Sequence, residues 1–343
     1  MREYLHDLES MQKKDNNNVM IMDENMTPSF SYNSLQGRTK NQVHGYQMSG
    51  INTFVKEFTS DDHAFSDKWT LPAVSEIVIS NVYNDLGVNS ALSYPINVDS
   101  YVSTNDKTKK FISPAYATVS EDVCSLKGLD VAIARNQDFL KFLKPAKLMG
   151  KFRYKLAGGD MWKVILNPKV KSELLKYMTE DCYNDFVNLY LLGVFSGNYD
   201  RNPGNLFFYK TKSGAKWEGL ITIDHELTLS TDCIKRYLNQ YNTTVPAKVL
   251  VNDFFDTLTC FWTPQGSVNY DAHSVRLYKL KKTLAEGKFQ DAQLELIDRI
   301  KEYDISTTMR HFYDKYNITG TYPTKLYDVT SYAWEKSKDI MLR

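Results

Sequence analysis

Four polar features of this sequence have the residue types and the order that phosphoryl chemistry requires. They are a lysine in a strand pattern, a glutamate in a helix pattern, an aspartate with an asparagine five positions later, and an aspartate behind a later strand: Lys56, Glu76, Asp200 with Asn205, and Asp224. Phosphoryl transfer from ATP needs a lysine at the phosphates, a carboxylate that holds this lysine, a base at the acceptor hydroxyl and ligands for Mg²⁺. The sequence contains one candidate for each role.

Each candidate, taken alone, also has an ordinary structural explanation. A lysine such as Lys56 can face solvent on an edge strand, and Glu76 can stabilise the first turn of a helix through the helix dipole. Asn-Pro-Gly at 202–204 is typical of a plain turn, and Asp224 can cap the segment that follows it. The occurrence of all four in one order, on suitable elements, favours a catalytic site.

The first two candidates lie on elements that local patterns predict. Residues 51–58, INTFVKEF, are rich in apolar residues and predict a strand with Lys56 near its middle. From Pro72 to Gly87 the apolar residues follow a helical period, which predicts a helix that ends at the glycine. Glu76 borders the apolar face of this helix, so it is the expected ion-pair partner of the strand lysine.

The other candidates flank a β-hairpin that is predicted behind a buried helix. Residues 182–196 are apolar on nearly every side of a helix, which predicts the centre of a helical lobe. A polar turn with Asp200 and Asn205 follows, and then LFFYK and WEGLITI are separated by the turn-forming TKSGAK. The hairpin at 206–223 returns the chain to its start, so Asp224 is expected close to Asn205.

The chain of 343 residues is long enough for two lobes. Residues 1–30 are polar and predict a loosely attached N-terminal arm. We expect a β-rich N-terminal lobe at 31–115 and a larger, mainly helical C-terminal lobe at 116–343. Within that lobe, 248–262 and 290–303 have helical spacing. The expected fold class is α+β.

The composition argues against several other classes of protein. The 42 Lys and Arg residues balance 41 Asp and Glu residues, so no overall field attracts the chain to nucleic acid or anionic lipid. Four separate cysteines favour neither a zinc ribbon nor a disulfide scaffold, and the H-E-x-x-H and Walker A motifs are absent. Without a signal-peptide pattern or an apolar run of about 18 residues, we expect a cytoplasmic protein with no transmembrane segment.

The motif D-R-x-x-x-N at 200–205, with a later I-D at 223–224, resembles the protein-kinase-like superfamily in its HipA-like and phosphatidylinositol-kinase-like branch. The resemblance covers roughly residues 33–230 in the order of the motifs. It implies a two-lobed kinase-like fold with a small β-rich N-lobe, a larger helical C-lobe, and ATP in the cleft between them.

The resemblance also implies a role for each candidate residue. Lys56 would bind phosphate, and Glu76 would pair with this lysine. Asp200 would be the catalytic base. Asn205 and Asp224 would hold Mg²⁺.

Three positions depart from the pattern of these kinases next to the proposed catalytic residues. Asn202 stands where the lipid-kinase-like pattern D-R-H has histidine. His225 and Glu226 follow Asp224 in place of Phe-Gly, so a glycine hinge and a phenylalanine switch are not inherited.

The loop expected to cover the phosphates, at 33–50, lacks the G-x-G-x-x-G pattern. Its Gly37 can still offer a backbone N–H group to phosphate, and Arg38 and Lys40 can add positive charge. These three residues are therefore candidates for nucleotide binding beside Lys56.

The leading hypothesis is an ATP- and Mg²⁺-dependent serine/threonine-protein kinase that acts on a protein substrate and does not bind nucleic acid directly. We also expect autophosphorylation in the segment 230–244, whose hydroxyls follow the proposed metal ligand. A lipid or small-molecule kinase, a nucleotidyl-transferring relative and a nucleotide-binding pseudokinase scaffold are the alternatives. Positive charge is sparse in the activation segment, with Lys235, Arg236 and Lys248, which favours a protein over a lipid acceptor.

Overall fold

The structure of the protein is a computed structural model. It describes residues 4–23, 26–28, 42–58, 68–98, 116–133, 162–198, 203–225, 245–262, 268–319 and 321–342. Statements about the structure concern these residues.

A six-stranded sheet forms the N-terminal part of the molecule. Its strands follow the order β1 (Met20–Ile21), β5 (Ser93–Asn97), β6 (Ala117–Glu121), β4 (Ile51–Glu57), β3 (Gln42–Met48) and β2 (Met26–Pro28). β1 and β5 are parallel, and the other neighbours are antiparallel. The turn between β3 and β4 has positive φ angles at Ser49 (51°) and Gly50 (81°), which glycine adopts without strain. The strand predicted around Lys56 is confirmed as β4, and β4 is an interior strand.

Helix α1 (Leu71–Asp85) follows the sheet strand β4 and carries Glu76. Thr70 caps its N-terminus by accepting a hydrogen bond from the Ala73 N–H at 3.3 Å. The chain turns away at Gly87, which has a φ of +79°. The predicted helix and its glycine stop are confirmed. The helix packs against β5 and β6 on one side and α11 on the other, so nearly all of its residues are buried.

The C-terminal part is mainly helical. Its α-helices are α4 (Trp162–Ile165), α5 (Pro168–Leu174), α6 (Glu180–Ser196), α8 (Ala247–Phe255), α9 (His273–Ala285), α10 (Asp291–Glu302), α11 (Ile305–Lys315) and α12 (Thr321–Leu342). The short 3-10 helices are η2 (Leu8–Met11), η4 (Val123–Ser125) and η5 (Pro203–Asn205). α6 confirms the predicted buried helix: it begins at the cap Thr179 and ends at Gly197, which has a φ of +67°. One continuous apolar core joins α1 to these helices.

Two smaller sheets are also present in the described part of the chain. β7 (Leu129–Ile133), β8 (Leu206–Thr211) and β9 (Gly219–Thr222) form an antiparallel sheet, and β10 (Leu258–Trp262) pairs with β11 (Val268–Ala272). The predicted hairpin before Asp224 is therefore confirmed as β8 and β9. A parallel bridge between Ser90 and Thr222 connects the segment after α1 to the end of β9.

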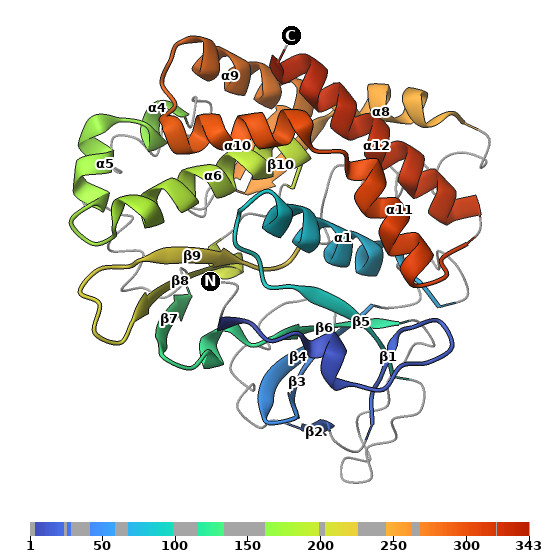
Figure 1. The fold of residues 1–343 in the computed structure, drawn as a ribbon. Coiled ribbons are helices and arrows are strands. Elements are labelled where there is room, and N and C mark those ends of the chain that lie inside the picture. Colours follow the sequence, from blue (N-terminus) through green and yellow to red (C-terminus); the bar gives the residue numbers. More distant parts are fainter. Residues whose placement is uncertain are drawn as a thin grey trace.

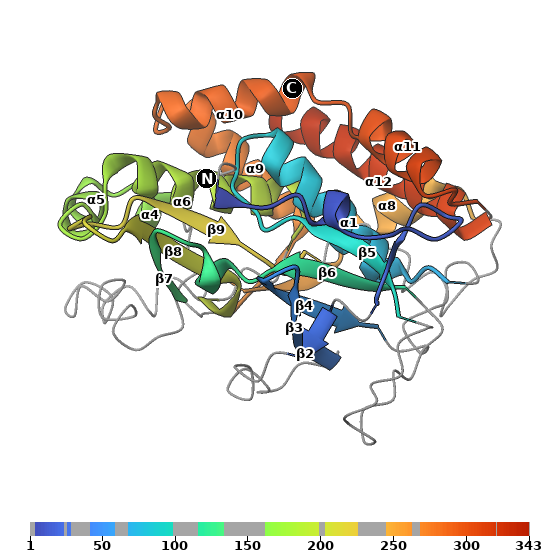
Figure 2. The same cartoon turned by 60° about the horizontal axis from the view of Figure 1, so that its bottom comes forward.

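In both ribbon views the helices α6 and α9–α12 lie on one side and the strands β3–β9 on the other, with α1 between them (Figures 1 and 2). This arrangement places the end of β9 beside α1 and the six-stranded sheet. Among the described helices, none has the length and apolar character needed to span a membrane.

The first thirty residues differ from the polar arm that their composition predicts. Leu8, Met20, Met22 and Met26 are buried in the apolar cluster on one face of the six-stranded sheet, to which the segment adds β1 and β2. The sequence does not reveal this because strands of two and three residues are too short to show a period, and β1 pairs with a strand more than seventy positions later.

Two further boundaries differ from the expected ones. The expected lobe boundary at 115 would assign β6 to the helical lobe, but β6 pairs with β4 and β5 in the six-stranded sheet. The helical spacing expected at 248–262 holds only to Phe255, and β10 begins at Leu258. A short apolar run is compatible with a helix and with a strand, and here pairing with β11 decides for the strand.

Candidate functional site

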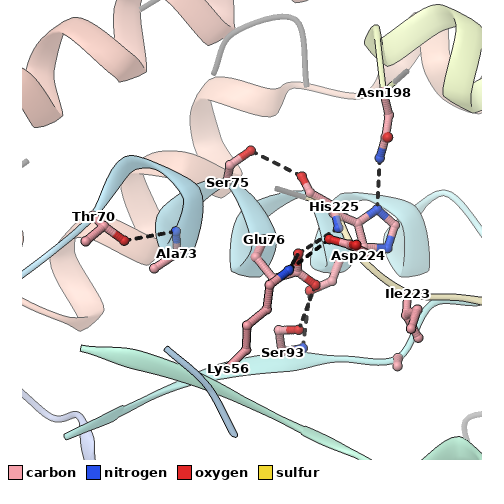
Figure 3. Close-up of polar contacts among 12 residues, drawn as sticks. Lys56, Thr70, Ala73, Ser75, Glu76, Ser93, Asn198, Ile223, Asp224 and His225 are labelled. Atoms are coloured by element: carbon pink, nitrogen blue, oxygen red, sulfur yellow. Dashed lines mark hydrogen bonds and ion pairs between the residues drawn. The ribbon is translucent and has the colours of Figure 1, made fainter. Parts of the chain in front are cut away.

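Lys56 lies near the end of β4, between β6 and β3, and its side chain points toward α1 and the end of β9 (Figure 3). The side chain is only 17% exposed, so its ammonium group requires charged or polar partners. The aliphatic part of the side chain brings the Nζ atom to 5.5 Å from the centre of the Phe58 ring, which adds a cation–π contact. Lys56 is therefore not a solvent-facing lysine on an edge strand.

Two carboxylates from distant parts of the chain share this ammonium group. Lys56 Nζ lies 2.9 Å from Asp224 Oδ1 and 3.9 Å from Glu76 Oε2. The predicted proximity of Lys56 and Glu76 is confirmed, but the shorter contact of the lysine is with Asp224. The structure thus brings together a strand lysine, a helix glutamate and the aspartate behind β9.

Glu76 is 5% exposed and uses both carboxylate oxygens. Oε2 accepts a hydrogen bond from the backbone N–H of His225 at 2.7 Å, and Oε1 accepts one from the Ser93 hydroxyl at 3.3 Å. Hydrogen bonds to an ionised acceptor are among the stronger ones in proteins. Glu76 therefore connects α1 to β5 and to the residue that follows Asp224, in addition to its contact with Lys56.

Asp224 lies two positions after the end of β9 and has a φ of +63°. This left-handed conformation costs most residues energy, although aspartate tolerates it better than others. The backbone before it is held by Asn205, whose carbonyl oxygen accepts hydrogen bonds from Ile223 N–H at 3.1 Å and from the Thr222 hydroxyl at 3.2 Å. The backbone of Asn205 therefore lies next to the residues directly before Asp224, as the predicted hairpin requires.

The donor set at this point suits a hard divalent cation. Asp224 has a carboxylate that is 25% exposed. Asn205 has a neutral amide side chain, and its backbone carbonyl contacts the residue directly before Asp224. Carboxylate and amide oxygens are the protein ligands that Mg²⁺ prefers. Asp224 and Asn205 are thus the residues that would hold the ion.

Other predicted site residues lie outside the described part of the chain. Asp200 falls between Asn198 and Pro203, which are described, and Gly37, Arg38 and Lys40 precede β3. The segment 230–244, where autophosphorylation is expected, also lies outside it. The roles of these residues remain predictions from the sequence.

A half-buried acid on α6, Asp185, supports the end of β9. Asp185 Oδ2 accepts a hydrogen bond from the Asn89 side-chain amide at 3.4 Å, and the Asn89 carbonyl accepts one from Thr222 N–H at 3.1 Å. Burial raises the pKa of Asp185 to about 7, although a hydrogen bond from the Leu220 backbone partly opposes this shift. Nothing in the local sequence pattern distinguishes Asp185 from a solvated helix residue, so this residue could not be predicted from the sequence.

The position of His225 was not predicted either, because in the sequence this residue is only a departure from Phe-Gly. The residue is fully buried, with an exposed fraction of 0%. Its place directly after a candidate metal ligand was the available signal.

Comparison with known proteins gives information on the fold. No family model matches the sequence, and no curated protein does. Among solved structures, the proinflammatory kinase CtkA of Helicobacter pylori is similar with a TM-score of 0.57, 12% identity, and coverage of 94% of this chain and 95% of that one. HipA of Shewanella oneidensis MR-1, from a complex with HipB and operator DNA, matches with a TM-score of 0.39 and 12% identity over 84% of this chain and 57% of that one. The predicted resemblance is confirmed at the level of the fold: the chain has the α+β, two-lobed fold of a protein-kinase-like protein.

Proposed function

We propose that this protein is an ATP- and Mg²⁺-dependent kinase that transfers the γ-phosphate to a serine or threonine hydroxyl of a protein. The observation that carries the proposal is the pairing of Lys56 with both Glu76 and Asp224, at 3.9 and 2.9 Å. A lysine that is held by a helix carboxylate and lies next to a candidate metal ligand is the arrangement that phosphoryl transfer from ATP requires.

In the proposed reaction the acceptor oxygen attacks the γ-phosphorus, the bond from that phosphorus to the β,γ-bridging oxygen breaks, and ADP leaves. Asp200, by its resemblance, would accept the proton of the attacking hydroxyl. Lys56 would bind the phosphates of ATP, while Glu76 keeps its ammonium group in place. Mg²⁺, held by Asn205 and Asp224, would supply positive charge against the negative charge of the phosphoryl oxygens.

The state of Lys56 in this structure has a consequence for nucleotide binding. In the short ion pair with Asp224, the lysine ammonium group occupies the carboxylate that would bind the metal, and the carboxylate occupies the ammonium group that would bind phosphate. Nucleotide and metal must therefore replace part of this ion pair, and each should bind more tightly in the presence of the other.

A protein acceptor is proposed over a lipid because positive charge is sparse in the segment between the metal ligand and α8. Hydroxyls at 230–244 would be phosphorylated slowly as a by-product of their high effective concentration. Intact-mass measurement after incubation with ATP and Mg²⁺, followed by mapping, tests this. Phosphate that maps only to residues before 31 would contradict the placement of this segment.

The test of the kinase proposal combines binding and turnover. Ligand at 100 times its Kd stabilises a native protein by about 2.7 kcal/mol, so ATP with Mg²⁺ should raise the Tm clearly. Incubation with γ-labelled ATP and a lysate should then label a protein band on serine or threonine. A lipid or small-molecule product would show that the acceptor class is wrong, and binding without transfer would favour the pseudokinase.

A matched pair of lysine variants shows whether this site is responsible. Lys56→Met should abolish the ATP-dependent Tm shift and the labelling. Lys210→Met is the control, because Lys210 is also a strand lysine over an aromatic ring, with its Nζ 5.6 Å from the centre of Trp217. An equal loss in both variants would contradict the assignment of the site to Lys56.

A further inference from the structure

His225 contacts the structure through both nitrogens of its ring. Nε2 lies 2.7 Å from the Ser90 hydroxyl. Nδ1 lies 3.3 Å from the side-chain amide nitrogen of Asn198 (Figure 3). The ring also packs edge-on against Tyr83 of α1, with centroids 4.7 Å apart. The residue therefore touches the segment after α1, the end of α6 and α1 itself.

The chemistry of these partners determines the direction of the hydrogen bonds. An amide nitrogen can only donate, so Nδ1 accepts from Asn198 and the ring proton is on Nε2. Nε2 then donates to Ser90, whose own hydroxyl is within reach of the carbonyl oxygens of Ala91 (3.2 Å) and Thr222 (3.4 Å). A directed chain thus runs from Asn198, two positions before Asp200, through His225 to the end of β9.

The backbone of His225 is held as firmly as its ring. Its N–H donates to Glu76 Oε2 at 2.7 Å, and its carbonyl oxygen accepts from the Ser75 hydroxyl at 3.3 Å. Two successive residues of α1 therefore hold the peptide groups on both sides of the His225 Cα atom.

These contacts account for the conformation of Asp224. A positive φ at a residue other than glycine persists when the surrounding structure fixes the backbone on both sides. Asn205 holds the backbone before Asp224, and His225 holds it afterwards. The carboxylate of Asp224 reaches Lys56 at 2.9 Å from this fixed backbone.

We infer that His225 is a positioning residue, which locks Asp224 in its left-handed conformation and couples the metal ligand to α1 and to the segment that leads into Asp200. This inference rests on the proposed function insofar as Asp224 binds Mg²⁺. The ring nitrogens, and not the bulk of the ring, carry this role, because a phenylalanine would fill the space beside Tyr83 without contacting Ser90 or Asn198.

The variants are chosen to separate polar contacts from packing. His225→Phe keeps an aromatic ring and removes both hydrogen bonds. His225→Asn retains an acceptor toward Asn198, and His225→Gln retains a donor toward Ser90. The matched control is His273→Phe: His273 is also buried, lies 3.4 Å from a serine hydroxyl through Nε2, and packs edge-on against Phe255 at 4.8 Å.

Two measurements are made on each full-length variant. The first is the Mg²⁺ concentration for half-maximal activity at saturating ATP. Loss of a residue that orients a metal ligand typically costs about 10- to 100-fold in metal affinity or activity. We expect a rise of that size for His225→Phe, a smaller rise for the asparagine and glutamine variants, and no change for His273→Phe.

The second measurement is hydrogen exchange of the amides in the peptide that contains 219–225, without any ligand. We expect faster exchange in His225→Phe than in His273→Phe, because without the ring contacts to Ser90 and Asn198 the backbone N–H of residue 225 would be held less firmly against Glu76. Equal Mg²⁺ midpoints in the two phenylalanine variants would overturn the inference. If the wild type shows neither nucleotide binding nor activity, the proposed function is wrong, and the hydrogen-exchange rates alone test the positioning role of His225. Equal rates in His225→Phe and His273→Phe would then overturn this role, and faster exchange in His225→Phe would support it.

Discussion

The two roles of Glu76, charge and hydrogen bonding, can be separated by two substitutions. Glu76→Gln keeps the size of the side chain, an oxygen that can accept from His225 N–H, and an amide that can donate to the Ser93 hydroxyl. It removes only the negative charge near Lys56. Glu76→Ala removes the charge and both acceptors, which leaves a buried N–H of His225 without its partner at 2.7 Å.

The distances in the site set the expected magnitudes. At an effective dielectric constant of about 20, the 3.9 Å separation of Lys56 and Glu76 corresponds to a gross attraction of about 4 kcal/mol. Desolvation of the buried carboxylate offsets most of this, and Lys56 keeps Asp224 at 2.9 Å. We therefore expect Glu76→Gln to lower the free energy of unfolding by about 1 kcal/mol, near the net value of one hydrogen bond. Glu76→Ala should cost about 3 kcal/mol or more, because each buried group that loses its partner adds about 1–3 kcal/mol.

Urea unfolding, followed by circular dichroism, measures these differences, and the Tm shift with ATP and Mg²⁺ reports on the site. Glu57 provides matched controls. It follows Lys56 on β4, its side chain lies on the opposite face of the sheet, and it is 7% exposed. It also has a basic neighbour, because His44 Nε2 lies 3.2 Å from its Oε1. Glu57→Gln and Glu57→Ala should leave the ligand-dependent Tm shift unchanged, whereas both Glu76 variants should reduce it. If Glu76→Ala were no more destabilising than Glu76→Gln, the hydrogen-bond argument would be wrong.

Three further predictions concern the remaining acids. Asp224→Ala should abolish phosphoryl transfer and weaken Mg²⁺-dependent nucleotide binding, while Asp200→Ala should abolish transfer and leave binding nearly intact. Calorimetric titration together with a transfer assay distinguishes the two variants. Wild-type turnover in either variant would contradict the role assigned to the substituted aspartate. Burial raises the pKa of Asp185 from 3.8 to about 7, so the folded protein keeps a proton that the unfolded chain loses, and stability falls as pH rises between these values. Asp185→Asn should abolish this fall, which is at most about 4 kcal/mol. The prediction would be wrong if the difference in the free energy of unfolding between the wild type and Asp185→Asn stayed constant from pH 4 to 8. Burial alone would raise the pKa of Glu9, but hydrogen bonds, foremost from Lys315, hold this pKa below its ordinary value of 4.5. Glu9→Gln should therefore be less stable than the wild type at neutral pH, and it should lose less stability when the pH falls below 4.5. Urea midpoints measured over this pH range would show both effects.

The sequence by itself determined the elements that carry the site, because each depends on neighbours within a few turns of the chain. The helix with Glu76 was predicted from the helical period of its apolar residues and from Gly87 at its end, and both signals are local. The alternating and apolar patterns of β4, β8 and β9 are local too. The order of Lys56, Glu76, Asp200 with Asn205, and Asp224 indicated an ATP site, and the resemblance of D-R-x-x-x-N and the later I-D to the protein-kinase-like superfamily implied the α+β fold.

Only the tertiary structure decided how these residues meet. Lys56 and Asp224 are 168 positions apart, and Glu76 and the His225 N–H are 149 apart, so no local pattern records that the lysine is nearer to the aspartate than to the glutamate. The same reason applies to the early residues: Met20 and Met26 belong to the sheet through partners far along the chain. A histidine after an aspartate has no distinct local preference, and its role follows from contacts to α1, α6 and β9 that form only when these elements pack together.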